Sequence, residues 1–176
     1  NFISLALAIE GPRLDSEFQV WVAETLGLKR TAFNPLSSGF VRSEIAASEK
    51  GNGFEKQTCV EMGFLDNKNP VAIAPGSDPF RSGIIWGEVH DNNAYFMSGV
   101  AGHAGLFSTA QEVFKIALQF LPNYTSLLRP ETCDLFRNNL THDANEHRSF
   151  AFQLASTTES AAGRMMSPQS YGDLGF

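Results

Sequence analysis

Residues that could do acid–base chemistry gather in one polar segment and in the glycine-rich turn after it. Residues 87–93 read GEVHDNN, in which Glu88, His90 and Asp91 are titratable, and His103 follows in the turn. Carboxylates and imidazoles together can move protons or bind a metal ion, but no spacing here matches a known metal-ligand pattern. We therefore expect no metal and no other cofactor. We expect the carboxylates to accept hydrogen bonds from backbone N–H groups and to fix the loop.

The glycine-rich turn and the helix after it must position these side chains. Glycine occurs at positions 99, 102 and 105, which permits positive φ and lets the backbone approach another surface closely. Thr109 and Glu112 fit a capping box, and Ser108 and Gln111 fit the same box one residue earlier, so a helix should begin at one of these two positions. Apolar residues spaced along 113–121 predict one buried stripe, and Pro122 should end the helix.

Other segments give less direct signals. The apolar residues 2–10 predict a buried helix, and Asp15 or Ser16 is the expected cap of the next helix. Residues 35–87 are rich in Pro, Gly, Ser and Asn, which favours mostly irregular structure. Residues 148–155 alternate in polarity and predict a strand.

Composition argues against several classes of function. The formal net charge is −6 and no basic cluster is present, so a nucleic-acid partner is not expected. No apolar run approaches the ~18 residues of a membrane span. Fifteen Phe with only 18% charged residues indicate either a well-filled core or faces that further polypeptide covers. Cys59 and Cys133 are expected to be free, small buried groups.

The two ends of the sequence indicate a piece of a longer protein. Residues 1–10 lack Met and begin inside an apolar helix, and residues 171–176 read as an interrupted strand. We therefore expect 1–176 to be a single partial domain whose partner is the remainder of its own polypeptide. Such a start would hide any signal peptide, so periplasmic, extracellular and cytoplasmic compartments all stay open.

Two stretches resemble the class C β-lactamase-like serine hydrolases, a family that includes penicillin-binding proteins, peptidases and esterases. They read EVHD at 88–91 and SGVAGHAGLFST at 98–109, with shorter matches at 25–33 (TLGLKRTAF) and 45–49 (IAASE). The resemblance implies an α+β fold, with an antiparallel sheet flanked by helices and a helical subdomain. This chain would be mainly helical, with long loops and few strands. It would hold the helical subdomain, a cleft-rim loop at about 34–87 and the start of an active-site strand at about 168–176.

The same resemblance implies an acyl-enzyme mechanism, in which a serine attacks after the lysine of a Ser-x-x-Lys motif takes its proton. Neither Ser-x-x-Lys nor the family's Tyr-x-Asn motif occurs in the sequence, so nucleophile and base are expected outside it. The third motif, Lys-Thr-Gly or His-x-Gly, corresponds to GDLGF at 172–176. There Asp173 takes the place of the cation, Gly175 that of the glycine, and Phe176 would supply the oxyanion-hole N–H.

Asp173 departs from the family pattern. A cation at that place attracts a substrate carboxylate and an aspartate repels it, so the intact protein would use neutral substrates or have reduced activity. The alternative is that Asp173 faces solvent and the correspondence slips by one residue. By resemblance the turn faces the acyl-binding cleft, which makes His103, Ala104 and Gly105 candidate pocket residues. His103 could instead brace the turn through backbone hydrogen bonds.

Three functions are consistent with the sequence. The first is part of a serine hydrolase acting on a small molecule or peptide, with β-lactam, peptidoglycan peptide and ester all open. The second is a catalytically inactive family member that serves as a binding or scaffold protein, which a missing Ser-x-x-Lys upstream would favour. The third ignores the resemblance and is a free-standing helical binding domain, which should melt cooperatively as a monomer.

Overall fold

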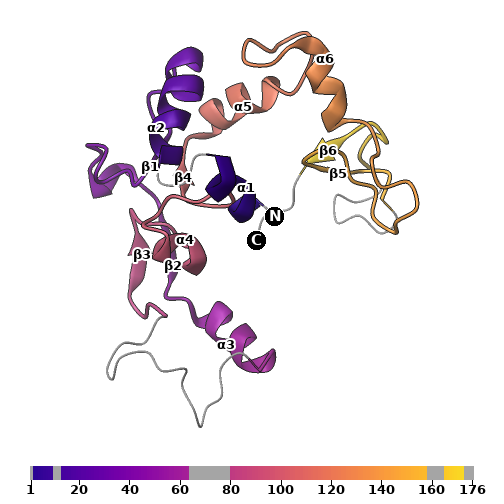
Figure 1. Ribbon diagram of the computed structural model, residues 1–176. Helices are drawn as coiled ribbons and strands as arrows, with labels where there is room; N and C mark the ends of the chain where they lie inside the picture. Colours follow the sequence, from indigo (N-terminus) through magenta and orange to yellow (C-terminus); the bar gives the residue numbers. More distant parts are fainter. Residues whose placement is uncertain (1, 10–12, 64–79, 158–164, 173–176) are drawn as a thin grey trace. The chain divides into compact units, whose positions relative to one another are not determined.

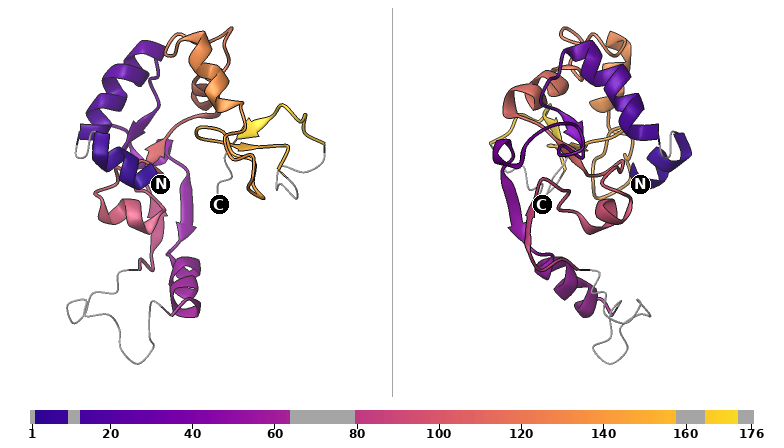
Figure 2. Two further views of the ribbon diagram at one scale, coloured as in Figure 1. Left: turned by 45° about the vertical axis from the view of Figure 1, so that its right-hand side comes forward. Right: turned by 90° about the vertical axis from the view of Figure 1, so that its left-hand side faces the viewer.

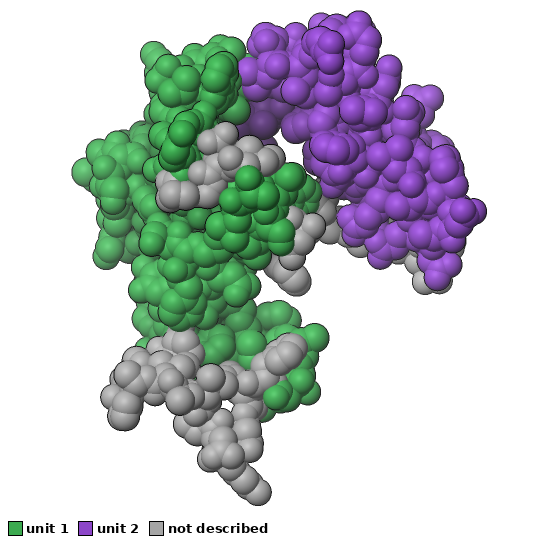
Figure 3. Space-filling model, in the orientation of Figure 1, with its two compact units in different colours: residues 1–109 green, residues 110–176 purple. Residues whose placement is uncertain are grey.

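The computed structural model describes residues 2–9, 13–63, 80–157 and 165–172. Over these residues the protein is a mixed fold, mostly helical, with short two-stranded antiparallel sheets. This confirms the expected helical content and the scarcity of strands. The chain divides into two compact units, residues 1–109 and 110–176 (Figure 3). The single partial domain over 1–176 stays a prediction.

Helices open the first unit: α1 is Phe2–Ile9, α2 is Leu14–Phe18 and the π-helical turns η2 are Gln19–Glu24 (Figure 1). The prediction that α1 is buried is wrong, because Phe2, Leu5 and Leu7 are each about half exposed. Part of α1 does pack tightly. An added Cβ at Gly102 would lie 2.3 Å from the Phe2 carbonyl oxygen and 2.6 Å from Ala6 Cβ. The glycine therefore allows the close backbone approach that its spacing predicts.

The predicted cap of α2 is also wrong. The helix begins at Leu14, and neither Asp15 nor Ser16 precedes it. Ser16 lies in the first turn, where its Oγ donates to the Arg13 carbonyl at 2.8 Å. Arg13 also forms an ion pair with Glu17. Because that pair spans one helical turn, it favours helical backbone one residue earlier than the capping pattern predicts.

A short antiparallel pair fixes the end of the glycine-rich turn. Strand β1 (Ala32–Phe33) pairs with β4 (Leu106–Phe107), with Ala32 opposite Phe107 and Phe33 opposite Leu106. The hydroxyls of Thr31 and Ser108 lie 2.7 Å apart at the end of the same ladder. The last residues of the turn are therefore held by a segment more than 70 residues earlier in the chain.

The segment predicted to be irregular contains regular structure. Strand β2 (Ala47–Lys50) pairs antiparallel with β3 (Ile84–Trp86), and helix α3 (Gly53–Glu61) continues from the end of β2 (Figure 2). The mostly irregular assignment of 35–87 is wrong over these elements. The side chains of α3 form no buried apolar stripe, and Phe54 is 68% exposed. Periodicity therefore gives no signal for this helix.

The second unit contains α5 (Ala110–Leu118), α6 (Pro130–Cys133), the 3-10 turn η4 (Asp134–Phe136), and strands β5 (Gln153–Leu154) and β6 (Tyr171–Gly172), which pair antiparallel. Its core is aromatic. The ring of Phe120 lies 4.9 Å from that of Phe136 and 5.1 Å from that of Phe152, and Tyr171 packs on Phe152 at 5.5 Å. Cys133 is fully buried beside them and Cys59 of the first unit is half-buried, and both are free thiols. In the described residues no helix has the length and apolarity needed to cross a bilayer.

Two predictions in the second unit are corrected. Helix α5 starts after Thr109 as predicted but ends at Leu118, because residues 119–121 donate to carbonyls three residues back and so form a tighter turn. The buried side chain of the helix is the polar Glu112, whereas Val113 and Phe114 are more than half exposed. Gln119, the residue after the helix, is also buried. Gln119 is buried because its Oε1 accepts from the Ser126 N–H at 2.7 Å.

The predicted strand over 148–155 is instead a hairpin. Arg148 and Gln153 face each other in an antiparallel bridge. Between them, the Ser149 N–H donates to the Phe152 carbonyl at 2.8 Å and the Phe152 N–H donates to Ser149 Oγ at 3.1 Å. Alternating polarity does not distinguish one strand from two short arms when a serine can close the turn.

Candidate functional site

Asp91 organises the polar segment at the start of helix α4 (Asn92–Phe96). It occupies the N-cap position, and its Oδ1 accepts from the Ala94 N–H at 2.7 Å. This confirms the expectation that a carboxylate of the segment accepts from the backbone. The cap satisfies one of the free N–H groups at the helix start. Asp91 therefore stays at a defined place after β3.

His103 lies against the same carboxylate. Its Nε2 is 2.9 Å from Asp91 Oδ1, and the two side chains are 22% and 30% exposed. The prediction that His103 bonds to backbone is wrong, because its partner is a side chain twelve residues earlier. An ionised carboxylate can only accept, so Nε2 must carry the hydrogen. The arrangement is a histidine–aspartate pair with the aspartate fixed by a helix start.

A small apolar cluster packs together the segments that carry the histidine–aspartate pair. Val89, Ala94 and Ala101 are buried together, and Ala104 and Met97 pack against them. Ala104, a candidate pocket residue, thus contacts this cluster. The residues come from the polar segment, from α4 and from the glycine-rich turn, so the cluster joins the three parts that carry Asp91 and His103.

Gly105 is held in a conformation that suits only glycine. Its φ is +113°, and an added Cβ would lie 2.3 Å from the Gly99 carbonyl oxygen. The turn is also held by the residue that follows β1, because Asn34 Nδ2 donates to the Ser98 carbonyl at 2.8 Å. Both Asn34 and Ser98 have positive φ, at +43° and +61°. The backbone that presents His103 is therefore closely constrained on both sides.

Arg81 and Asn52 form a second support that the sequence did not indicate. Asn52 is 1% exposed, and its Nδ2 donates to the His90 carbonyl at 3.0 Å. Arg81 Nε donates to Asn52 Oδ1 at 2.9 Å, while its two terminal nitrogens donate to the carbonyls of Val89, at 2.6 Å, and His90. The guanidinium carbon lies 4.2 Å from the centre of the Tyr95 ring. We call Arg81 and Asn52 the clamp.

The remaining titratable groups make contacts around the segment. His90 Nε2 lies 2.7 Å from Glu49 Oε2, a close ion-pair distance without the geometry of a hydrogen bond. Glu55 Oε1 accepts from the Asn92 N–H at 3.2 Å, and Glu88 lies 3.7 Å from Arg81. Over the described ranges no group of three His, Cys, Asp or Glu side chains is placed to hold a metal ion.

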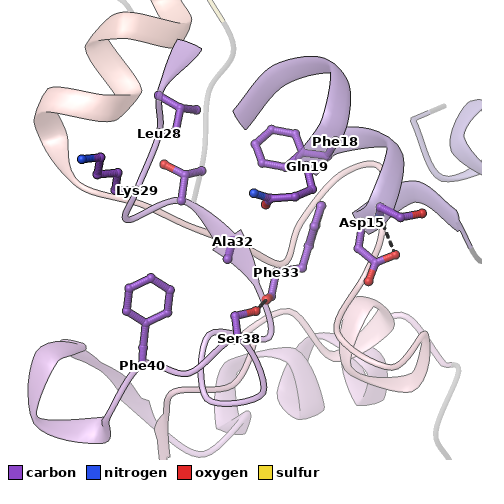
Figure 4. A pocket seen from close by; sticks show the side chains of 11 residues that line it. Asp15, Phe18, Gln19, Leu28, Lys29, Ala32, Phe33, Ser38 and Phe40 are labelled. Carbon is purple, nitrogen blue, oxygen red and sulfur yellow. Dashed lines mark hydrogen bonds between the residues drawn. The ribbon is translucent and has the colours of Figure 1, made fainter. Parts of the chain in front are cut away.

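The first unit also holds an open pocket of about 440 Å³ that the sequence did not predict. Its walls come from α2 and η2 and from β1 with the turn after it; they include Asp15, Phe18, Gln19, Phe33, Ser38 and Phe40 (Figure 4). The rings of Phe18 and Phe33 meet edge to face at 5.9 Å. Phe33 Cδ1 would lie 3.2 Å from an added Cβ at Gly105. One aromatic ring therefore borders both the pocket and the glycine-rich turn.

The predicted catalytic residues Asp173, Gly175 and Phe176 lie outside the described residues. The two residues before them form β6, which is anchored within the second unit. Tyr171 donates its hydroxyl hydrogen to the Phe120 carbonyl at 2.9 Å. Burial raises the pKa of the Tyr171 phenol, which keeps the group protonated as a donor.

Comparison with known proteins gives relatives described as carboxypeptidases. The chain is 31% identical over 175 residues to the "Putative D-alanyl-D-alanine carboxypeptidase" of Escherichia coli (strain K12), which covers 96% of this chain and 36% of that protein. The protein of the same description from Salmonella agona (strain SL483) is 31% identical over 170 residues, 93% of this chain and 35% of that protein. The chain is a distant homologue of these proteins. It spans about a third of their length.

The other comparisons give no match. No protein-family model matches the chain, and no solved structure matches it.

Proposed function

We propose that this chain forms part of a serine hydrolase that cleaves a peptide ending in D-alanyl-D-alanine. The observation that carries the proposal is the 31% identity over 96% of the chain to a relative described as a D-alanyl-D-alanine carboxypeptidase. Of the three substrates left open by the sequence, a peptide is the one this description names. The β-lactamase and penicillin-binding fold implied by the EVHD and SGVAGHAGLFST stretches is part of the same proposal.

The proposed reaction proceeds through an acyl-enzyme. A serine hydroxyl attacks the carbonyl of the peptide bond, a neighbouring base takes its proton, and the terminal D-alanine leaves with that proton on its amine. Water then hydrolyses the ester. The sequence contains no Ser-x-x-Lys, so serine and base come from the rest of the polypeptide. The described residues would supply a wall of the cleft, with His103, Ala104 and Gly105 facing the substrate.

Exposed apolar side chains support a role within a larger structure. Val113 and Phe114 of α5 and Leu5 and Leu7 of α1 are about half exposed or more. Because each is already about half covered, burying the rest of such a side chain would add about 1 kcal/mol, roughly half of the value for burial from full exposure. We propose that the remainder of the polypeptide covers these faces, so it is the main partner of the chain.

A catalytically inactive relative is the second candidate. Asp173 supports this candidate, because an aspartate replaces the cation that would attract the substrate's terminal carboxylate. Such a protein would keep the fold and bind a partner or ligand without forming an acyl-enzyme. The two candidates make opposite predictions for covalent labelling.

The test is labelling of the intact protein with a fluorescent penicillin and, separately, with a fluorophosphonate. The hydrolase predicts a stoichiometric label from at least one of them, and the inactive relative predicts none from either. Replacing the aspartate with the family's cation, Asp173→His, should speed labelling by the penicillin, which carries a carboxylate. Asp143→His is the matched control, because Asp143 lies in an exposed loop of the second unit, and it should leave the rate unchanged.

A further inference from the structure

The clamp holds a charged group in a place that water reaches poorly. The Arg81 side chain is only 13% exposed, and its nearest carboxylate, that of Glu88, is 3.7 Å away. Its direct partners are neutral oxygens: Asn52 Oδ1 and the carbonyls of Val89 and His90. A planar guanidinium can hold several acceptors in fixed directions, which an ammonium on a flexible stem cannot do. The side chain is therefore suited to orienting backbone.

The two carbonyls that Arg81 holds belong to the residues immediately before Asp91. The His90 carbonyl belongs to the peptide plane that contains the N and Cα atoms of Asp91, so holding that carbonyl holds these two atoms in place. Asn52 adds a hydrogen bond to the same His90 carbonyl at 3.0 Å. Asp91 Oδ1 in turn accepts from the Ala94 N–H and from His103 Nε2. A continuous series of hydrogen bonds and covalent links therefore runs from Arg81 to the imidazole in the glycine-rich turn.

The histidine at the end of this series presents a free nitrogen. Because Nε2 carries the hydrogen toward Asp91, Nδ1 of the neutral ring is an acceptor. In the part of the chain that the structure describes, Nδ1 has no hydrogen-bond partner. An acceptor on a constrained turn suits a ligand with an N–H group, and a peptide backbone supplies such groups.

We propose that Arg81 and Asn52 are positioning residues that orient the Asp91–His103 pair, so that His103 Nδ1 accepts a hydrogen bond from an amide N–H of the substrate peptide. The identity of the ligand rests on the proposed function. The positioning itself rests only on the contacts of the first unit.

The kinetic test is a double-mutant cycle in the intact protein with a D-alanyl-D-alanine peptide as substrate. We expect His103→Ala and Arg81→Met each to lower kcat/KM on the order of 10- to 100-fold, because the hydrogen-bonding group is removed or misplaced. The double variant should be no slower than the slower single variant, since both changes break one series of contacts. Independent, multiplicative losses, or no loss in His103→Ala, would overturn the proposal.

Two further variants separate positioning from a general loss of folding. Arg81→Lys keeps the charge and can reach one carbonyl, so it should fold and recover only part of the loss. Arg148→Met is the matched control: this arginine is 47% exposed and its guanidinium pairs with Glu146. It should change kcat/KM by less than about twofold, as expected for an exposed ion pair. A full recovery by Arg81→Lys would contradict the need for the planar fork.

A second measurement, of the His103 ring by NMR, does not depend on catalytic activity. Ring ¹⁵N signals of the intact protein can be assigned to His103 by their loss in His103→Ala. We expect the wild type to show one tautomer, with hydrogen on Nε2, and Arg81→Met to show averaging between the two. If the wild type neither hydrolyses the peptide nor accepts a penicillin label, the proposed function is wrong, and this spectrum alone decides the positioning. Identical His103 signals in both proteins would overturn it.

Discussion

Replacing Gly105 with alanine tests how tightly the glycine-rich turn is constrained. Two costs combine at this position. The backbone has φ +113°, where a side chain is strained by about 1–3 kcal/mol. The new Cβ would also lie 2.3 Å from the Gly99 carbonyl oxygen, a backbone atom that cannot rotate away. Such overpacking adds about 1–3 kcal/mol. We therefore expect Gly105→Ala to lower the free energy of unfolding of the first unit by about 2–6 kcal/mol.

Two other glycines separate these costs. Gly39 has φ +93° with nothing within 4 Å of an added Cβ, so Gly39→Ala should show the backbone strain alone, about 1–3 kcal/mol. Gly53 is the first residue of α3, has no positive φ and is equally open, so Gly53→Ala should stabilise by about 0.4–1 kcal/mol. All three variants replace glycine with alanine, so any difference in their stability comes from the backbone conformation and the surroundings of each position.

Urea denaturation, monitored by tryptophan fluorescence, measures the free energy of unfolding of the first unit. The chain has two tryptophans, Trp21 and Trp86, and both lie in residues 1–109. Trp86 reports directly on the sheet beside the polar segment, since its Nε1 donates to the Ile45 carbonyl at 2.6 Å. If Gly105→Ala costs no more than Gly39→Ala, Gly99 and Gly105 do not approach as described, and the reasoning about the turn is refuted.

Three further predictions concern single side chains. Asp91→Ala should lower the stability of the first unit by about 1 kcal/mol through loss of the α4 cap and Asp91→Ser by less, as measured by the same urea titration; equal losses would contradict the cap. Burial raises the pKa of the Cys133 thiol, so at pH 7.5 a maleimide should label half-buried Cys59 first, and peptide mapping that finds Cys133 equally reactive would contradict its burial. The raised pKa of Tyr171 means that the folded state holds the phenol proton more tightly than the unfolded state does. The stabilisation is complete below about pH 10, the unfolded pKa, and is lost as pH rises through the folded pKa. Circular dichroism melts from pH 8 to 11 should show this loss in the wild type and less of it in Tyr171→Phe, which lacks the hydrogen bond to the Phe120 carbonyl.

Local signals predicted some elements correctly. The start of α5 after Thr109 follows from capping chemistry that acts within one turn. Helix α3 was missed because its side chains form no apolar stripe, and the 148–155 hairpin was missed because a serine closes a turn inside an alternating run. These elements depend on contacts that periodicity does not record.

In the candidate site, too, some features could be predicted from local sequence and others depend on tertiary contacts. Asp91 and His103 could be named from their residue types, and the role of Asp91 as a backbone acceptor follows from its place in a polar loop. Their pairing required the turn to bring residues twelve apart together. Arg81 and Asn52 are 29 residues apart and meet only because β2 pairs with β3. No local pattern marks either one, so the clamp could not have been inferred from the sequence.

The central claim is that these residues line a cleft whose reactive serine belongs to another part of the polypeptide. The most direct measurement is peptide mapping by mass spectrometry after the intact protein is treated with a penicillin. The account predicts one acyl group, attached to a serine outside residues 1–176 and followed three residues later by lysine. An acyl group on a serine within residues 1–176, or no acyl group at all, would contradict it.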